Sequence, residues 1–129
     1  IHDWKRPWRI TGNSSVYRFK LGAFPGLLPY FREHFDEIRQ KFRNEQAYLS
    51  WYVDREKKLS YWPESWCKSY KYHCLQKIPM AYFKPPVKPE GAKIIVFHGE
   101  INPPDAVNGG GGKWYRYVLP SQWIKDAWQ

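Results

Sequence analysis

A histidine and a glycine that directly follow a hydrophobic run are the first residues whose types and spacing suggest chemistry. His98 and Gly99 come after four apolar residues, 94–97, and Pro103 and Pro104 follow shortly afterwards. The apolar run predicts a strand that is covered on both faces, and the glycine and prolines end it. His98 is therefore expected at the carboxyl end of a strand. In open α/β sheets that edge is where ligands bind, so we expect a ligand site there.

Two further pairs of polar residues flank predicted elements. Asn13 and Ser14 precede a predicted strand, and Glu45 and Gln46 begin a predicted helix. Each pair alone has a plain structural explanation, a turn for the first and a helix cap with solvated charges for the second. A histidine after a strand can likewise be a core residue. Only the combination of the three segments favours a functional site.

The elements that must position these residues alternate between strand and helix. Residues 16–19 alternate in polarity and predict a strand, whereas residues 31–42 carry apolar side chains at helical spacing. A second helical pattern starts at Asn44, a favourable N-cap residue, so two helices or one bent helix both fit. A short strand followed by irregular structure is expected within residues 59–75. Ser121 is expected to cap a final short helix.

Length, charge and cysteine content limit the class of protein. The chain has 129 residues, enough for one domain at most, and a formal charge of +9. A basic surface attracts anions, including nucleic acid, acidic lipid and diphosphate groups. Cys67 and Cys74 are too few for a disulfide scaffold and lack zinc-site spacing, so we expect reduced core residues and a cytoplasmic protein. No signal peptide or membrane segment is expected, because no apolar run is long enough to span a bilayer.

The order of several segments resembles the C-terminal half of bacterial glycosyltransferases with the nucleotide-diphospho-sugar transferase fold, called GT-A. The segments are GNSSVYRF, RNEQAYLSW, YWPESWCKSYKYHC, IIVFHGEINPP and WIKDAW. The resemblance runs from about Asn13 to Trp128 and is most specific in FHGEINPP, which is similar to a terminal His-Gly motif followed by Lys-Pro in such enzymes. Glycogenin-like enzymes carry a distantly comparable motif. The implied fold is α/β, a partial Rossmann-like GT-A mixed sheet with flanking helices.

The resemblance also implies that half of the domain is missing. In the family an Asp-x-Asp motif and the nucleotide-binding βαβ units precede the Asn-Ser pair, and no Asp-x-Asp occurs in these 129 residues. Residues 1–129 are therefore expected to be a single incomplete domain whose N-terminal nucleotide-binding half is absent. Its partner would be that missing half, and the chain alone is expected to be inactive or nearly so.

The implied reaction moves a sugar from a nucleotide-diphosphate donor to the hydroxyl of a carbohydrate or other acceptor. In such enzymes Mn or Mg holds the diphosphate, because negative charge grows on the leaving group. By resemblance His98 is a metal ligand, and Gly99 lets the backbone approach the diphosphate. Asn102 stands where the family often has Lys, so either Lys71, Lys93 or Lys113 supplies the positive charge or the loop tolerates its loss.

The remaining site residues are also assigned by resemblance. Asn13 and Ser14 match the Asn-Ser pair that binds donor-sugar hydroxyls, and Glu45 and Gln46 match an Asp-Gln pair. The carboxylate of Glu45 could bind sugar hydroxyls, stabilise a cationic transition state, or act as the base of an inverting enzyme. These three roles stay open.

Two other classes of function fit the composition. In a non-catalytic carbohydrate- or nucleic-acid-binding module, Trp62, Trp66 and Trp114 would stack on sugars or bases. A basic RNA-binding domain would instead bind with a steep salt dependence. The glycosyltransferase interpretation, which we favour, predicts no nucleic-acid partner.

Overall fold

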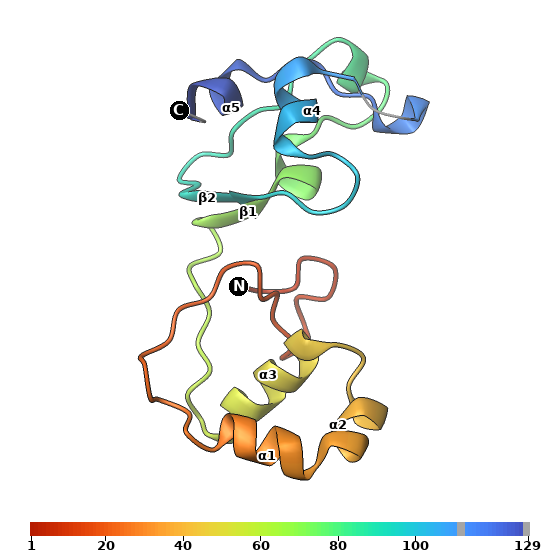
Figure 1. Cartoon of the computed structure of the whole chain (residues 1–129). Coiled ribbons are helices and arrows are strands. Elements are labelled where there is room, and N and C mark those ends of the chain that lie inside the picture. The colour runs from red at the N-terminus through yellow and green to blue at the C-terminus, as the bar shows by residue number, and fades with distance from the viewer. Residues whose placement is uncertain (111–112, 128–129) are drawn as a thin grey trace. The chain divides into compact units, whose positions relative to one another are not determined.

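The computed structural model of this chain describes residues 1–110 and 113–127. The chain divides into two compact units, Ile1–Trp62 and Pro63–Gln129. The described residues contain several helices and a small parallel sheet, a mixed content compatible with the α/β class that the sequence predicts (Figure 1). Whether both units belong to one larger, incomplete domain stays a prediction.

The first unit contains three helices among its described residues (Figure 1). They are α1 (Leu27–Glu33), α2 (Phe35–Lys41) and α3 (Glu45–Arg55). The amphipathic pattern of residues 31–42 is helical as predicted, but it is divided between α1 and α2 because the backbone leaves the helical region at His34 (φ −114°, ψ 30°). The predicted start of the next helix is confirmed, since the side chain of Asn44 accepts the Ala47 N–H at 3.1 Å.

The core of the first unit is mainly aromatic. Ile38, Tyr48 and Tyr52 are buried, and the hydroxyl of Tyr48 donates to the carbonyl of Leu27 at 2.9 Å, which joins α3 to α1. Partly buried side chains surround them: Phe24, Leu27, Tyr30, Phe31, Phe42 and Trp51. The predominance of rings explains part of the high aromatic content, because each buried ring removes a large apolar area from water.

The predicted strand at residues 16–19 is wrong. These residues are all described and form no strand, and the side chains of Tyr17 and Phe19 are 67% and 59% exposed. Their rings stack on each other at 5.9 Å. Alternating polarity predicts a strand only where one face is buried and a neighbouring strand pairs with the backbone, and neither condition holds here.

The second unit is built around two short parallel strands, β1 (Cys67–Ser69) and β2 (Ile94–Val96) (Figure 1). Ser69 is opposite Val96 in the register. The short strand predicted within residues 59–75 is therefore confirmed, whereas the irregular structure predicted after it is wrong, because Tyr70–Cys74 form a helix. The remaining elements are the π-helix Tyr70–Cys74, the 3-10 helices Met80–Tyr82 and Trp114–Arg116, and helices α4 (Pro103–Asn108) and α5 (Gln122–Ala127).

Burial of β2 is uneven, which corrects one expectation. Val96 is buried, but Ile94 is 39% exposed, so the apolar run is not covered on both faces along its whole length. A two-stranded sheet has two edges and little area to cover, so a continuous apolar run does not require burial of every residue. The final helix begins directly after Ser121, as predicted.

The second unit has a compact hydrophobic core. Tyr70, Cys74, Ala106 and Ile124 are almost fully buried and come from the π-helix, α4 and α5. Partly buried side chains complete this core: Leu75, Ile95, Phe97, Ile101, Val107 and Trp123. Both cysteines are buried and free, as expected from the sequence.

Gly109, which ends α4, occupies a backbone conformation that other residues rarely adopt. Its φ is +78°, and a Cβ atom would lie 2.7 Å from Cδ of Pro120. We expect Gly109→Ala to lower the free energy of unfolding by about 2 to 3 kcal/mol, through backbone strain and this collision. Gly22 has a similar φ of +76° with no atom within 4 Å of its would-be Cβ. Gly22→Ala is therefore the control, and equal losses in urea unfolding would show that the Pro120 contact is unimportant.

Burial of Cys74 makes stability depend on pH in the alkaline range. It raises the pKa of the thiol from an ordinary 9.0 to about 11. Between these values the unfolded chain loses the proton first, so unfolding becomes easier as the pH rises. We expect a loss on the order of 2 kcal/mol between pH 9 and pH 11 in urea unfolding, which Cys74→Ala should reduce. An unchanged pH slope in Cys74→Ala would assign the loss to other groups.

Candidate functional site

The carboxyl ends of the two parallel strands bring His98 next to Ser69. Ser69 is the last residue of β1, and His98 follows β2 after one intervening residue. The Oγ atom of Ser69 lies 2.6 Å from Nε2 of His98. Parallel strands end at the same edge of a sheet, so residues distant in sequence meet there. His98 thus lies at the edge that the sequence indicated, and Ser69 is a contact that the sequence analysis did not identify.

Ser69 is held in place by its own backbone and by the start of the π-helix. Its side chain is fully buried, and its Oγ accepts the Tyr72 N–H at 3.2 Å. Its N–H donates to Nδ1 of His73 at 2.9 Å. A serine followed by a helical turn is a recognisable N-cap pattern, and this signal could have identified Ser69 from the sequence.

An aromatic ring lies beside the histidine, and a lysine lies beside that ring. The rings of Tyr72 and His98 have centroids 5.4 Å apart, and Nζ of Lys71 lies 5.7 Å from the centroid of the Tyr72 ring. Lys71 is exposed. An exposed lysine in this segment favours an anionic ligand.

Gly99 and Asn102 differ in what they offer to a ligand. Gly99 has a φ of +96° with no atom within 4 Å of a would-be Cβ, so the space above its backbone is open. Asn102 is the N-cap of α4, and its N–H donates to the Asp105 carboxylate at 2.9 Å. The backbone of Asn102 therefore starts a helix, while Gly99 lets a ligand approach the chain closely.

In the first unit, one residue of each predicted pair contacts a residue of the other pair. The hydroxyl of Ser14 donates to Oε1 of Glu45 at 3.2 Å, across 31 positions of sequence. The side chain of Asn13 accepts the Ser15 N–H at 2.8 Å and so belongs to a turn, while Gln46 is half-buried in the first turn of α3. The turn and the cap expected as plain explanations are both present, and the turn also places Ser14 against Glu45.

The described residues test only part of the predicted metal site. Among residues 1–110 and 113–127 no group of three or more His, Cys, Asp or Glu side chains could hold a metal ion. His98 has the Ser69 hydroxyl as a hydrogen-bond partner at one ring nitrogen. Its role as a metal ligand stays a prediction.

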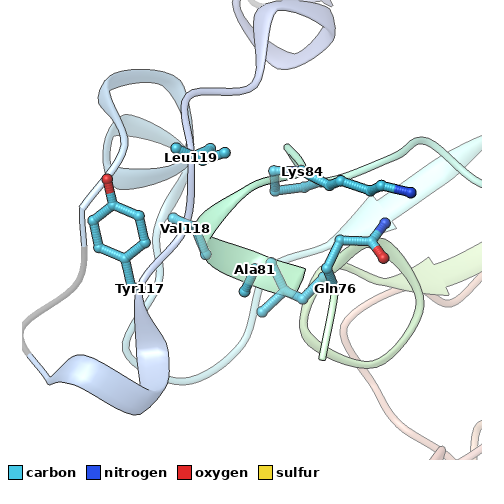
Figure 2. Close-up of a pocket in the computed structure, with 8 residues that line it drawn as sticks. Gln76, Ala81, Lys84, Tyr117, Val118 and Leu119 are labelled. Atoms are coloured by element: carbon cyan, nitrogen blue, oxygen red, sulfur yellow. The ribbon is translucent and has the colours of Figure 1, made fainter. Parts of the chain in front are cut away.

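A cavity in the second unit is too small to bind a nucleotide or a sugar. It measures about 10 Å³ and is lined by Leu75, Gln76, Ala81, Lys84, Pro86, Tyr117, Val118 and Leu119. In Figure 2 the polar ends of Gln76 and Lys84 point to the same side, away from Tyr117. This volume holds about one water molecule. None of its lining residues is a predicted site residue.

Comparisons with family models, curated proteins and solved structures give no match for this chain. In the part of the chain that the structure describes, no helix is both long and apolar enough to cross a membrane. The chemistry of the two groups of residues, Ser14 with Glu45 and Ser69 with His98, is therefore the basis for assigning a function.

Proposed function

We propose that this chain is the C-terminal half of a GT-A glycosyltransferase, which transfers a sugar from a nucleotide diphosphate to an acceptor hydroxyl. The observation that carries the proposal is the position of His98 at the carboxyl edge of parallel strands, next to the open backbone of Gly99 and beside Tyr72, whose ring Lys71 contacts. An imidazole, a cation and an approachable backbone together suit a diphosphate group.

Each group of residues has a separate role in this proposal. His98 would provide one ligand to Mn or Mg, a cation that would supply positive charge to the diphosphate. Lys71 supplies the positive charge that Asn102 lacks, and Gly99 allows the diphosphate to lie close to the chain.

The residues that the resemblance assigns to sugar binding lie in the first unit. The Asn13 amide and the Ser14 hydroxyl would hold sugar hydroxyls, and the carboxylate of Glu45 would face the positive charge that develops at the anomeric carbon. Gln46 would add an amide contact. The Ser14 to Glu45 hydrogen bond supports this role, because it orients the carboxylate from outside its own helix.

The test is nucleotide-diphosphate binding by calorimetry, with and without manganese. The protein used is the parent protein, in which the proposed nucleotide-binding half precedes this chain. We expect manganese-dependent binding that His98→Ala weakens by at least about 100-fold, since losing a ligand costs at least as much as losing a residue that holds one. Without manganese the variant and the unmodified protein should bind equally weakly. His34→Ala, in the first unit, is the control.

If His98→Ala and His34→Ala bind the nucleotide diphosphate equally well in manganese, His98 is not part of the binding site. Failure of the parent protein to bind any nucleotide diphosphate would overturn the proposed function as a whole. Binding by this chain alone, at the affinity of the parent protein, would contradict the expectation that it is half of a domain.

A second candidate function, a carbohydrate- or nucleic-acid-binding module, rests on exposed aromatic rings. The side chain of Trp114 is 72% exposed, and that of Trp66 is 40% exposed with Nζ of Lys93 lying 5.8 Å from its ring centroid. Such rings can stack on sugars or bases without a metal. Metal-independent binding of an oligosaccharide or oligonucleotide that Trp114→Ala removes and Trp8→Ala leaves unchanged would favour this function. Trp8 is a suitable control because it is 77% exposed.

A further inference from the structure

The segment that leads into α1 exposes several large apolar side chains (Figure 1). Tyr17, Phe19 and Leu21 are 67%, 59% and 90% exposed. Arg18 and Lys20, which lie between them in the sequence, are also exposed. We propose that residues 17–21 form a loop that docks the first unit onto a membrane surface containing anionic phospholipids. This role is independent of the proposed function.

The two aromatic rings of the loop form one apolar surface. The rings of Tyr17 and Phe19 stack with their centroids 5.9 Å apart and an angle of 16° between their planes. Residues two apart in an extended chain share one side, which explains how two rings so close in sequence can stack. Neither ring belongs to the described core of the first unit. Their apolar surface is therefore offered to a partner outside the unit.

Leu21 lies at the tip of a tight turn. The Ala23 N–H donates to the carbonyl of Lys20 at 3.0 Å, which closes a turn over residues 20–23. Gly22 occupies the third position of this turn with a φ of +76°, a conformation that favours glycine. The turn holds the side chain of Leu21 in water, where only an external partner can cover it.

The sequence around the loop carries charges of one sign. Residues 4–32 contain six lysines and arginines and no aspartate or glutamate. Two of the six, Arg18 and Lys20, lie in the loop itself. Each lysine or arginine at an anionic membrane surface strengthens binding about fivefold. Their long side chains can keep the charge at the level of the lipid phosphates while apolar neighbours lie deeper.

A lipid surface suits this combination of side chains better than a nucleic acid does. Leu21 has no flat face on which a base could stack, and the rings of Tyr17 and Phe19 already stack on each other. The boundary between lipid headgroups and acyl chains accepts aliphatic and aromatic side chains alike, and anionic headgroups supply the complementary charge. Because a loop of this size inserts few side chains, we expect reversible binding.

Two double variants separate the apolar and the electrostatic contributions. Phe19→Ala combined with Leu21→Ala removes apolar area from the loop. Arg18→Gln combined with Lys20→Gln removes two positive charges. All four positions are exposed, so neither variant creates a cavity in the core.

Each double variant has a matched control elsewhere in the chain. Phe83→Ala removes an aromatic side chain that is 76% exposed but belongs to the second unit. Arg39→Gln combined with Arg43→Gln removes two exposed charges from another part of the first unit. Circular dichroism should first establish that each variant is folded.

The measurement is co-sedimentation of this chain with vesicles of phosphatidylcholine, with or without phosphatidylserine. We expect binding when phosphatidylserine is present and little binding without it. Binding should weaken as the salt concentration rises, because ions screen the attraction. The apolar double variant should bind at least about tenfold more weakly, and the charge double variant about 10- to 30-fold more weakly. Both controls should stay within about threefold of the unmodified chain, since they leave the loop intact.

The same measurement can overturn the proposal. Absence of binding to vesicles that contain phosphatidylserine would do so, and so would equal losses in the loop variants and their controls. If vesicles are not bound, self-association that the loop variants abolish would assign residues 17–21 to a second copy of the chain. Oligonucleotide binding that they abolish would then assign the loop to nucleic acid. None of these results bears on nucleotide-diphosphate binding, which the His98 variant tests.

Discussion

Replacing Tyr70 by alanine should destabilise the second unit more than any other single truncation considered for that unit. The residue is 1% exposed, and its ring stacks on that of Phe97 with centroids 4.6 Å apart. It also contacts Cys74, Ala106 and Ile124 in the core. We expect a loss of about 3 to 5 kcal/mol in the free energy of unfolding, from lost burial and from the cavity left behind.

Two variants separate the contributions of the ring and the hydroxyl of Tyr70. Tyr70→Phe removes only the contact of its hydroxyl with Oγ of Ser121 at 3.4 Å, and should cost about 1 kcal/mol. Tyr115→Ala is the control for truncating a tyrosine at the surface, because Tyr115 is 47% exposed. The free energies come from urea unfolding followed by far-UV circular dichroism. A loss in Tyr70→Ala no larger than that in Tyr115→Ala would mean that this core does not hold the unit together.

Local signals in the sequence predict some elements well. The side chain of Asn44 caps a helix, and α3 begins at the next residue, as this residue type predicts. The apolar run ended by Gly99 predicts β2 in the right place. In both cases the residues that fix the structure are neighbours in sequence, so the information is present in a short window.

Other features depend on contacts that a short window does not contain. The helical periodicity of residues 31–42 continues across His34, yet the helix is interrupted there. The ring of His34 packs edge-on against that of Tyr30, with centroids 4.2 Å apart. No proline or glycine marks this position. The alternation in residues 16–19 is equally strong locally, but no partner strand pairs with it.

In the candidate site, too, some features follow from neighbouring residues and others from contacts distant in sequence. His98 was identified because the residues around it end a strand. Its contact with Ser69 spans 29 positions and exists only because β1 and β2 pair in parallel, and the contact of Ser14 with Glu45 spans 31 positions. Pairings over such distances depend on how elements pack, which neither composition nor periodicity specifies.

Glu45→Gln should reduce sugar transfer by the parent protein by about 10²- to 10⁴-fold. The substitution keeps the shape of the side chain and an oxygen that can accept the Ser14 hydroxyl, so it removes mainly the negative charge. Two of the proposed roles require that charge, because a neutral amide neither stabilises a cationic sugar nor takes a proton. Glu45→Asp keeps the charge, and under the proposed function Asp is the residue that the family carries at this position. It should therefore retain far more activity than Glu45→Gln.

The control must remove a similar carboxylate from a similar place. Glu37 is exposed and lies in the first turn of α2, as Glu45 lies in the first turn of α3. Both side chains interact favourably with a helix N-terminus, by about 0.3 to 1 kcal/mol, so Glu37→Gln reproduces the structural part of the change. Turnover and KM for donor and acceptor should be measured for all three variants. A fall in turnover with little change in KM would assign the charge of Glu45 to the transition state, whereas a rise in KM alone would assign it to binding of sugar hydroxyls. Equal turnover in Glu45→Gln and Glu37→Gln would mean that Glu45 only stabilises the N-terminus of its helix.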